Sequence, residues 1–281
     1  MKRTPSIVSI DCTQSMLADV ARNSIEKMTF RPNFRRDGKV FAAAKLIIST
    51  SEWAAACLRR EYPDCETEIA VRPNPVDTSV FSDKLPGERM SRSGTARKVE
   101  VLFLGGDFER KGGPDLLEAW EQGRISEVAT LKIVTGNDIP VREHDGVVWL
   151  SGISVHTDEW LNLWRAADVF VMPTREEAFG NVFQEASAAG LPSIGTRITA
   201  LPEVIIDGET GLLIPSGNVT GLINALRTLI ESPEMRYRMG AAARRHVEKT
   251  SDPNNYAAFL DMSIRRLARG RSASGASQLE M

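Results

Sequence analysis

Short apolar runs alternate with stretches that repeat apolar residues at helical spacing along the chain from residue 99 onward. The runs predict strands at Val99–Leu104, Thr130–Val134, Val147–Leu150, Val169–Met172, Pro192–Gly195 and Leu212–Pro215. The other stretches predict helices at Pro114–Glu121, Asp158–Ala166, Asn181–Ala189, Ala200–Ile206, Asn218–Glu231, from Ser232-Pro233 onward, and at Asn254–Arg269. Such alternation is typical of right-handed βαβ units, so we expect an α/β fold with a doubly wound parallel sheet.

The segment from Thr174 to Pro192, TREEAFGNVFQEASAAGLP, joins one predicted strand to a helix through a turn at Phe179 and Gly180. The first N–H groups of a helix have no intrahelical partner and lie at the positive end of its dipole. We therefore expect the N–H groups of Gly180, Asn181 and Val182 to receive a phosphate. Glycine also lets a ligand approach the backbone closely.

Two carboxylates, Glu177 and Glu185, flank this turn eight positions apart. Glu185 lies one turn into the helix, and helical side chains tilt toward the N-terminus, so its carboxylate is expected to point back at the ligand. A carboxylate repels phosphate but accepts hydrogen bonds from vicinal hydroxyls, which makes a ribose the natural partner of Glu185. Glu177 would face the other end of the ligand. Either glutamate alone is more commonly a solvated surface residue, but convergent polar groups mark a binding site.

A cationic segment, LGGDFERKGG, follows the strand that ends at Leu104. Gly105 and Gly106 are expected at the carboxyl end of that strand, where parallel sheets bind ligands. Arg110 and Lys111 come just before the next helix, and their side chains suit phosphate oxygens. The alternative is a solvated pair of surface cations. No GxxxxGK[ST] sequence follows, so the segment is not a Walker loop.

Together these motifs resemble the retaining glycosyltransferases of family 4, the glycosyl transferases group 1, which have the GT-B fold of two facing Rossmann-like domains. The resemblance extends from about Ala44 to Ala258. Its motifs are AKLIISTSEWAAACLRREYP, VRPNPVDTSVF, VLFLGGDFERKGG, LKIVTGN, VVWLSG, WRAADVFVMPT, the E-x7-E segment and LPEVIIDGETGLLIPSGN.

The resemblance implies transfer of a sugar from a UDP- or GDP-sugar to a hydroxyl acceptor with retention, without a metal or other cofactor. In the family the Lys-Gly pair contacts the donor diphosphate, which implies that role for Lys111 and its neighbour Arg110. Many members have an arginine where this chain has Gly106, and Arg110 is expected to replace it. Glu177 would hold or polarise the transferred sugar, and the leaving phosphate would take the acceptor proton.

The resemblance also implies a domain plan in which VRPNPVDTSVF is the interdomain linker. Residues 1–75 would form the acceptor-side domain and linker, 76–252 the donor domain, 253–269 a crossover helix and 270–281 a disordered tail. Only about 70 residues then remain for a domain that normally takes roughly 100 to 200. We expect a shortened first domain, arising from a gene-start artefact or from a natural short form completed by a partner chain or dimer.

The composition narrows the remaining classes of protein. A net charge of −2 and a pI near 6.0 give no electrostatic argument for nucleic-acid binding. Three cysteines without metal-ligand spacing fit a reducing cytoplasm and indicate no metal site. No apolar stretch reaches the roughly 20 residues that span a bilayer. Two basic clusters are expected either to be solvated or to contact an anionic membrane surface; they comprise Arg35, Arg36, Lys39, Arg265, Arg266, Arg269 and Arg271.

Two other function classes stay open at this point. One is a non-catalytic or split-chain module that binds a nucleotide-sugar but lacks a complete acceptor site. The other is a GT-B epimerase or phosphorylase, which would place its catalytic acids differently or need a lysine for pyridoxal phosphate. His144, His156 and His246 favour surface roles, and none of them matches the first-domain histidine of the family.

Overall fold

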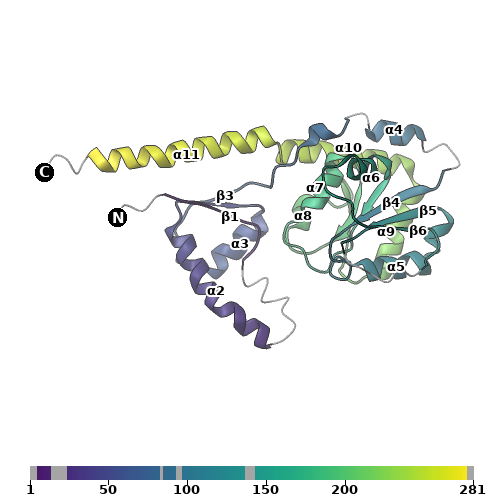
Figure 1. Ribbon diagram of the computed structural model, residues 1–281, viewed down its shortest axis with the longest axis horizontal. Coiled ribbons are helices and arrows are strands. Elements are labelled where there is room, and N and C mark those ends of the chain that lie inside the picture. Colours follow the sequence, from purple (N-terminus) through teal and green to yellow (C-terminus); the bar gives the residue numbers. More distant parts are fainter. Residues whose placement is uncertain (1–4, 14–23, 83–84, 93–96, 137–142, 277–281) are drawn as a thin grey trace. The chain divides into compact units, whose positions relative to one another are not determined.

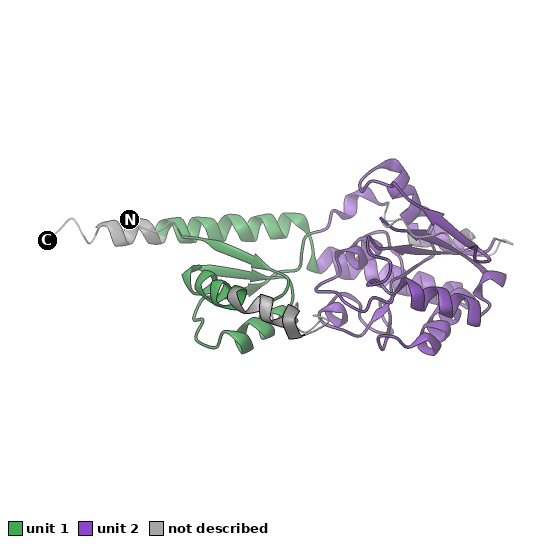
Figure 2. Ribbon diagram, turned by 60° about the horizontal axis from the view of Figure 1, so that its bottom comes forward, with its two compact units in different colours: residues 1–75, 250–281 green, residues 76–249 purple. Residues whose placement is uncertain are grey.

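The computed structural model describes residues 5–13, 24–82, 85–92, 97–136 and 143–276 (Figure 1). The chain divides into two compact units (Figure 2). Unit 1 comprises Met1–Pro75 and Thr250–Met281, and unit 2 comprises Val76–Lys249. The expected linker therefore lies across the boundary at Pro75, and the expected crossover helix lies in unit 1.

Unit 2 is built on a six-stranded parallel sheet in the order β6-β5-β4-β7-β8-β9. The strands are β4 Val99–Leu104, β5 Ala129–Val134, β6 Val147–Leu150, β7 Val169–Val171, β8 Ser193–Thr196 and β9 Gly211–Ile214. The helices are α4 Leu85–Arg92, α5 Gly113–Gln122, α6 Asp158–Ala166, α7 Asn181–Ala188, α8 Leu201–Val204, α9 Val219–Glu231 and α10 Pro233–Thr250. Short 3-10 turns occupy Thr78–Val80 and Ile125–Glu127.

The parallel α/β architecture predicted for this region is confirmed. Figure 1 shows α5 and α9 on one side of the sheet and α6, α7 and α10 on the other. The central strands are continuous apolar runs because both of their faces are covered; Val169, Phe170 and Val171 of β7 are fully buried. Helices α6 and α9 begin at side-chain caps that the sequence supplies, Thr157 and Asn218.

An aromatic chain fills the core beside β7. Trp160 and Trp164 of α6 have ring centroids 5.7 Å apart, and Trp164 lies 5.3 Å from Phe170. Phe170 in turn lies 5.3 Å from Phe183 of α7. These contacts tie α6 and α7 to the same strand, so the helix that carries Glu185 is held by packing.

Helix α4 was not predicted from the sequence, where Pro86 and Gly87 indicate a turn. Arg89 accounts for its position. The buried Arg89 guanidinium donates to the carbonyl oxygens of Ala189 (2.6 Å) and Trp164 (2.8 Å), which follow α7 and end α6. A cation at these helix C-termini meets the negative ends of two helix dipoles.

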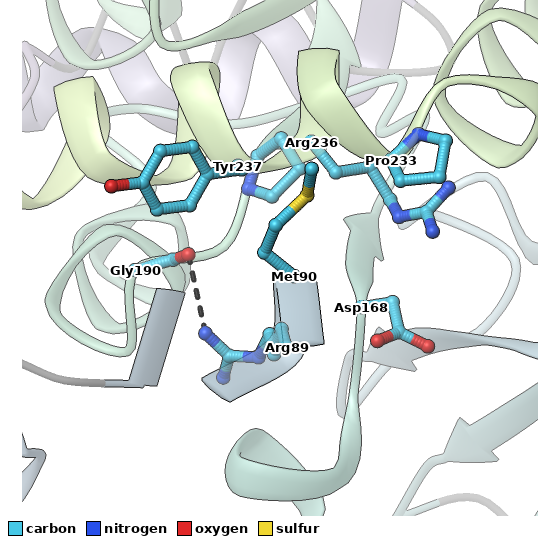
Figure 3. A pocket seen from close by; sticks show the side chains of 8 residues that line it. Arg89, Met90, Asp168, Gly190, Pro233, Arg236 and Tyr237 are labelled. Atoms are coloured by element: carbon cyan, nitrogen blue, oxygen red, sulfur yellow. Dashed lines mark hydrogen bonds between the residues drawn. The ribbon is translucent and has the colours of Figure 1, made fainter. Parts of the chain in front are cut away.

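A hollow lies beside Arg89 at the amino ends of β7 and β8 (Figure 3). Its empty volume of about 240 Å³ includes space open to the solvent. Arg236, on its wall, donates to the carbonyl oxygens of Leu229 (2.6 Å) and Ile230 (2.7 Å) at the end of α9. The cations around this hollow therefore hold helix ends together, at the edge of the sheet opposite to the one where parallel sheets bind ligands.

Unit 1 contains a three-stranded parallel sheet in the order β1-β2-β3, formed by Ile7–Ile10, Leu46–Ser49 and Ile69–Val71. Its helices are α2 Ser24–Ala43, α3 Glu52–Glu61 and α11 Pro253–Ala276. The strand at Leu46–Ser49 and helix α3 lie within the motif AKLIISTSEWAAACLRREYP, which carries part of the family resemblance. Neither α2, which contains Pro32 and Gly38, nor the short β3 was predicted.

Helix α11 belongs to unit 1 and contacts its sheet region. The Arg266 guanidinium pairs with Glu68 at 2.7 Å, and Arg72 lies over the Phe259 ring at 4.4 Å. Arg265 pairs with Asp261, so acidic neighbours offset part of the predicted basic cluster. The helix continues to Ala276, into the residues that were expected to be disordered. Residues 277–281 of that tail lie outside the described residues.

In the part of the chain that the structure describes, no helix is both long and apolar enough to cross a membrane. The same residues contain no group of three or more His, Cys, Asp or Glu side chains that could hold a metal ion.

Candidate active site

The strand order of unit 2 reverses between β4 and β7. From β4 the chain moves outward through β5 and β6, and it then returns to the other side of β4 and moves outward through β7, β8 and β9. Ligands of open parallel sheets bind beyond the carboxyl ends of the strands at such a switch point. The cationic loop follows β4 and the Glu177 loop follows β7, so both predicted motifs lie at this position.

The two loops contact each other through their backbones. The Arg175 N–H donates to the Arg110 carbonyl at 3.0 Å. Gly112 lies against Pro173, since a Cβ on Gly112 would come within 2.0 Å of the Pro173 carbonyl oxygen. The chain therefore brings the cationic and the acidic loop together directly, and glycine is required at residue 112.

Lys111 and Glu177 form an ion pair across the switch point. The Lys111 Nζ lies 2.5 Å from the Glu177 Oε2, and each side chain is only 14% exposed. The Ala178 N–H donates to the other carboxylate oxygen at 3.1 Å. The sequence predicted both residues in the site, but it did not predict that they pair.

Arg110 lies on the outer side of this pair. Its guanidinium donates to the Glu176 carbonyl at 3.1 Å and lies 3.4 Å from the Asp107 carboxylate. The Arg110 side chain is 41% exposed, against 14% for Lys111. Two cations of different accessibility thus lie together at the end of β4.

Two helices begin at the switch point, and both have a left-handed glycine as N-cap. Gly112 before α5 has φ +79°, and Gly180 before α7 has φ +86°. A glycine has no side chain to cap the first turn. In α5 the Gly113 N–H donates to the Phe108 carbonyl at 2.8 Å and Pro114 has no N–H, so of the two helix starts α7 is the better placed to meet an acceptor group. A Cβ on Gly180 would also come within 2.7 Å of Leu201.

The remaining predicted donor-binding residues surround these helix starts. Gly105 is buried, and a Cβ there would press on the Lys111 side chain at 3.0 Å. Gly106 is exposed with open space beside it. Phe179 is 4% exposed and belongs to the core, while Asn181 is exposed and Val182 is partly buried. The Phe179 side chain therefore packs in the core and anchors the turn instead of facing a ligand.

Glu185 lies in the second turn of α7 and is partly buried. Burial raises its pKa to about 7. Among the described residues no cation or hydrogen-bond donor offsets this effect. A carboxylate in this state has acceptor capacity left for a ligand, as its predicted role toward ribose hydroxyls requires.

The structure adds residues that the sequence did not indicate. Arg175 makes a bidentate ion pair with the buried Asp115 of α5, at 2.5 and 3.1 Å, and this pair raises the pKa of Arg175. Thr174 and Thr199 donate to the carbonyl oxygens of Glu176 (2.8 Å) and Glu177 (2.6 Å). Single threonines carry no sequence signal for such bonds.

Comparison with known proteins shows which family this chain resembles. Residues 98–232 match the family model described as glycosyl transferases group 1. A D-inositol 3-phosphate glycosyltransferase from Arthrobacter sp. (strain FB24) is 31% identical, over 77% of this chain and 55% of the relative. The enzyme of the same name from Streptomyces bingchenggensis is 36% identical, over 84% of this chain and 56% of the relative. The chain thus spans a little over half the length of these relatives.

Solved structures agree on the fold. Sucrose-phosphate synthase from Thermosynechococcus elongatus superposes with a TM-score of 0.77 at 24% identity, over 94% of this chain and 68% of that one. Anabaena HepE, solved with UDP and glucose, superposes with a TM-score of 0.69 at 17% identity, over 93% and 71%. These are GT-B glycosyltransferases, so the predicted fold class is confirmed. On its motifs, fold and relatives, the chain belongs to the glycosyl transferases group 1 family.

Proposed function

We propose that this protein transfers a sugar from a nucleoside-diphosphate sugar to an acceptor hydroxyl, with retention of configuration. The observation that carries the proposal is the Lys111–Glu177 pair at the β4–β7 switch point, flanked by the two glycine-capped helix starts. This arrangement places a cation and the N–H groups of a helix start where a diphosphate can bind, and a carboxylate where sugar hydroxyls can bind.

The cationic groups would act on the leaving nucleoside diphosphate. Negative charge accumulates on the bridging oxygen as the glycosidic bond breaks, and groups fixed in advance stabilise that charge. Lys111 is enclosed and would contact the phosphates as a point charge, while the more exposed Arg110 would add a planar fork. The N-terminus of α7 would receive the phosphate through backbone N–H groups. Under this proposal no metal ion is required for charge neutralisation.

The carboxylates would hold the hydroxyl-bearing parts of the donor. Glu185, partly buried on α7, would accept hydrogen bonds from ribose hydroxyls. Glu177 would hold or polarise the transferred sugar. Without donor, Lys111 and Glu177 neutralise each other; with donor bound, the diphosphate would attract Lys111 and leave the Glu177 carboxylate to sugar hydroxyls. The leaving phosphate would take the proton of the acceptor.

The relatives support this reading. Anabaena HepE is described in complex with UDP and with UDP-glucose, which makes UDP-sugars the first donors to test. GDP and its sugars remain the other class. The acceptor proposed here is a hydroxyl of a sugar or a lipid-linked sugar, in the synthesis of a glycan, polysaccharide or glycolipid.

Calorimetric titration with UDP and GDP tests the donor site. We expect one of them to bind with micromolar to millimolar affinity, and Lys111→Ala to weaken that binding. The control is Lys249→Ala at the end of α10, an exposed lysine outside the switch point. No heat with either nucleotide at millimolar concentration would contradict the proposed donor site.

A nucleotide-sugar-binding module that needs a second chain for transfer is the other candidate function. It is favoured by the small sheet of unit 1, which has three strands in the described residues against six in unit 2. Donor hydrolysis and transfer, measured by mass spectrometry with a panel of sugar acceptors, separate the two. Donor binding without turnover by this chain alone would support the module.

A further inference from the structure

We propose that Thr199 is a positioning residue that aims Glu177 at the sugar half of the donor. This inference rests on the proposed function. It concerns the loop between β8 and α8, in which the sequence motifs assign no functional residue.

Thr199 has an unusual backbone conformation. Its φ is +48°, and the only other non-glycine residues with positive φ among the described residues are Arg124 and His156. A β-branched residue in the left-handed region is a genuine outlier, because its Cβ substituents crowd the backbone. Such conformations persist where the surroundings fix them, and they cluster at functional sites.

The Thr199 hydroxyl contacts the backbone of the acidic loop. Its Oγ1 donates to the Glu177 carbonyl oxygen at 2.6 Å. This bond joins the end of β8 to the residue whose side chain pairs with Lys111. The left-handed turn at Thr199 thus places a donor directly on the backbone of Glu177.

The other threonine and arginine hydrogen bonds in this region go to the carbonyls of Thr174 and Glu176, and the bond from Thr199 goes to the carbonyl of Glu177. Thr196 donates to the Thr174 carbonyl at 2.6 Å, and Thr174 donates to the Glu176 carbonyl at 2.8 Å. Arg110 also donates to the Glu176 carbonyl. Glu176 therefore has two donors, whereas the Glu177 carbonyl is bonded by Thr199. The N–H of the same peptide, that of Ala178, donates to the Glu177 carboxylate at 3.1 Å, so the carboxylate turns with this peptide. Loss of the Thr199 bond would leave the peptide without its bond on the carbonyl side and would let the peptide and the Glu177 carboxylate rotate together.

Three substitutions of Thr199 distinguish the effect of its hydroxyl group from the effects of its backbone strain and side-chain shape. Thr199→Ser keeps the hydroxyl, Thr199→Val keeps the shape and the strain but removes the hydroxyl, and Thr199→Gly removes both strain and hydroxyl. Thr228→Val is the matched control, because the exposed Thr228 of α9 makes a similar hydroxyl-to-carbonyl bond, to Asn224 at 2.7 Å, outside the switch point.

The readout is calorimetric affinity for UDP, GDP, UDP-glucose and GDP-mannose, with the melting temperature measured on each variant. We expect Thr199→Val and Thr199→Gly to weaken binding of the nucleotide-sugar about five- to tenfold. Affinity for the bare nucleotide should change less than about twofold, since Lys111 and the helix start are untouched. Thr199→Ser and Thr228→Val should bind both as the unsubstituted protein does.

The possible outcomes separate the claims. Equal loss of nucleotide and nucleotide-sugar binding in Thr199→Val would mean a merely structural role and would overturn the inference. Unchanged nucleotide-sugar binding in both Thr199→Val and Thr199→Gly would overturn it as well, while the donor site stands. Failure of the unsubstituted protein to bind any of the four ligands would overturn the proposed function and this inference together.

Discussion

At the scale of single residues, the Lys111–Glu177 pair determines the electrostatics of the site. A carboxylate that neutralises Lys111 would also repel a diphosphate, so under the proposed function the two partners should affect ligands differently. The 14% exposure of both side chains keeps solvent from screening this interaction fully.

A double-mutant cycle of Lys111→Ala and Glu177→Ala tests the pair. We expect Lys111→Ala to weaken nucleotide binding and to lower any transfer rate by ~10²–10³. Glu177→Ala should leave nucleotide binding unchanged or tighter, because a negative charge is removed, but it should abolish the added affinity of the nucleotide-sugar. In thermal unfolding, the change in unfolding free energy of the double mutant should differ from the sum of the two single changes by about 0.5–3 kcal/mol. Parallel losses of nucleotide affinity in both variants would contradict these roles.

Glu185 gives the site a dependence on pH. Its pKa in the folded protein is about 7, against an ordinary value of 4.5, so the folded state favours the protonated form. This contribution to stability is fully present below pH 4.5 and is lost as the pH rises through 7. Ribose hydroxyls, in contrast, bind the ionised form better.

Glu185→Gln should therefore have opposite effects on stability and on binding. We expect its melting temperature to exceed that of the unsubstituted protein by a few degrees at pH 8 and by much less at pH 5. Its nucleotide affinity should lack the rise between pH 6 and 8 that we expect for the unsubstituted protein. Glu209→Gln, at an exposed carboxyl, serves as the control. A pH-independent difference in melting temperature would rule out this assignment.

At the scale of elements, the glycines before α5 and α7 allow both helices to begin beside the switch point. Gly112, Gly180 and Gly217 have similar positive φ values of +79°, +86° and +73°. They differ in their surroundings, since a Cβ on Gly217 meets nothing within 4 Å, whereas one on Gly112 meets the Pro173 carbonyl at 2.0 Å.

An alanine series at these three glycines should separate conformational strain from steric conflict. Gly217→Ala should lower the free energy of unfolding by about 1–2 kcal/mol, which is the cost of placing a residue with a Cβ in the left-handed conformation. Gly180→Ala should cost more, and Gly112→Ala should cost the most and disrupt the nucleotide site. Chemical denaturation measures all three; equal losses would mean that the close approach of the two loops is not required.

The elements also show what the sequence can predict. Continuous apolar runs located β4 and β6 to the residue and β5, β7, β8 and β9 to within one residue, because buried parallel strands need such runs. Helix α4 escaped prediction because its position depends on Arg89, whose partners are about 75 and 100 residues away in the sequence. Long-range contacts of this kind leave no local periodicity.

The same limit applies to the site. Glu177, Lys111 and Gly180 were predictable because strand ends, helix starts and charge types are local signals. The Lys111–Glu177 bond and the left-handed turn at Thr199 were not, since both depend on the register of β7 against β4 and β8. Sequence patterns thus placed these groups at the strand ends and helix starts where the structure has them, and the tertiary fold determined their partners.

At the scale of the whole molecule, the residues proposed to bind the donor lie within unit 2, whose described strands extend to both sides of the switch point. Unit 1 supplies a smaller parallel sheet and helix α11. Because the chain spans little more than half of its relatives, donor binding is the part of the proposal that unit 2 alone can support.

The central claim is that a nucleoside diphosphate binds between the helix starts of α5 and α7. Diffraction from crystals grown with UDP, and in parallel with GDP, tests it most directly. We expect diphosphate density within hydrogen-bonding distance of Lys111 and of the N–H groups at Gly180 and Asn181, with the ribose at Glu185. Nucleotide density elsewhere on the protein, with the Lys111–Glu177 pair intact and no density beside it, would contradict the account.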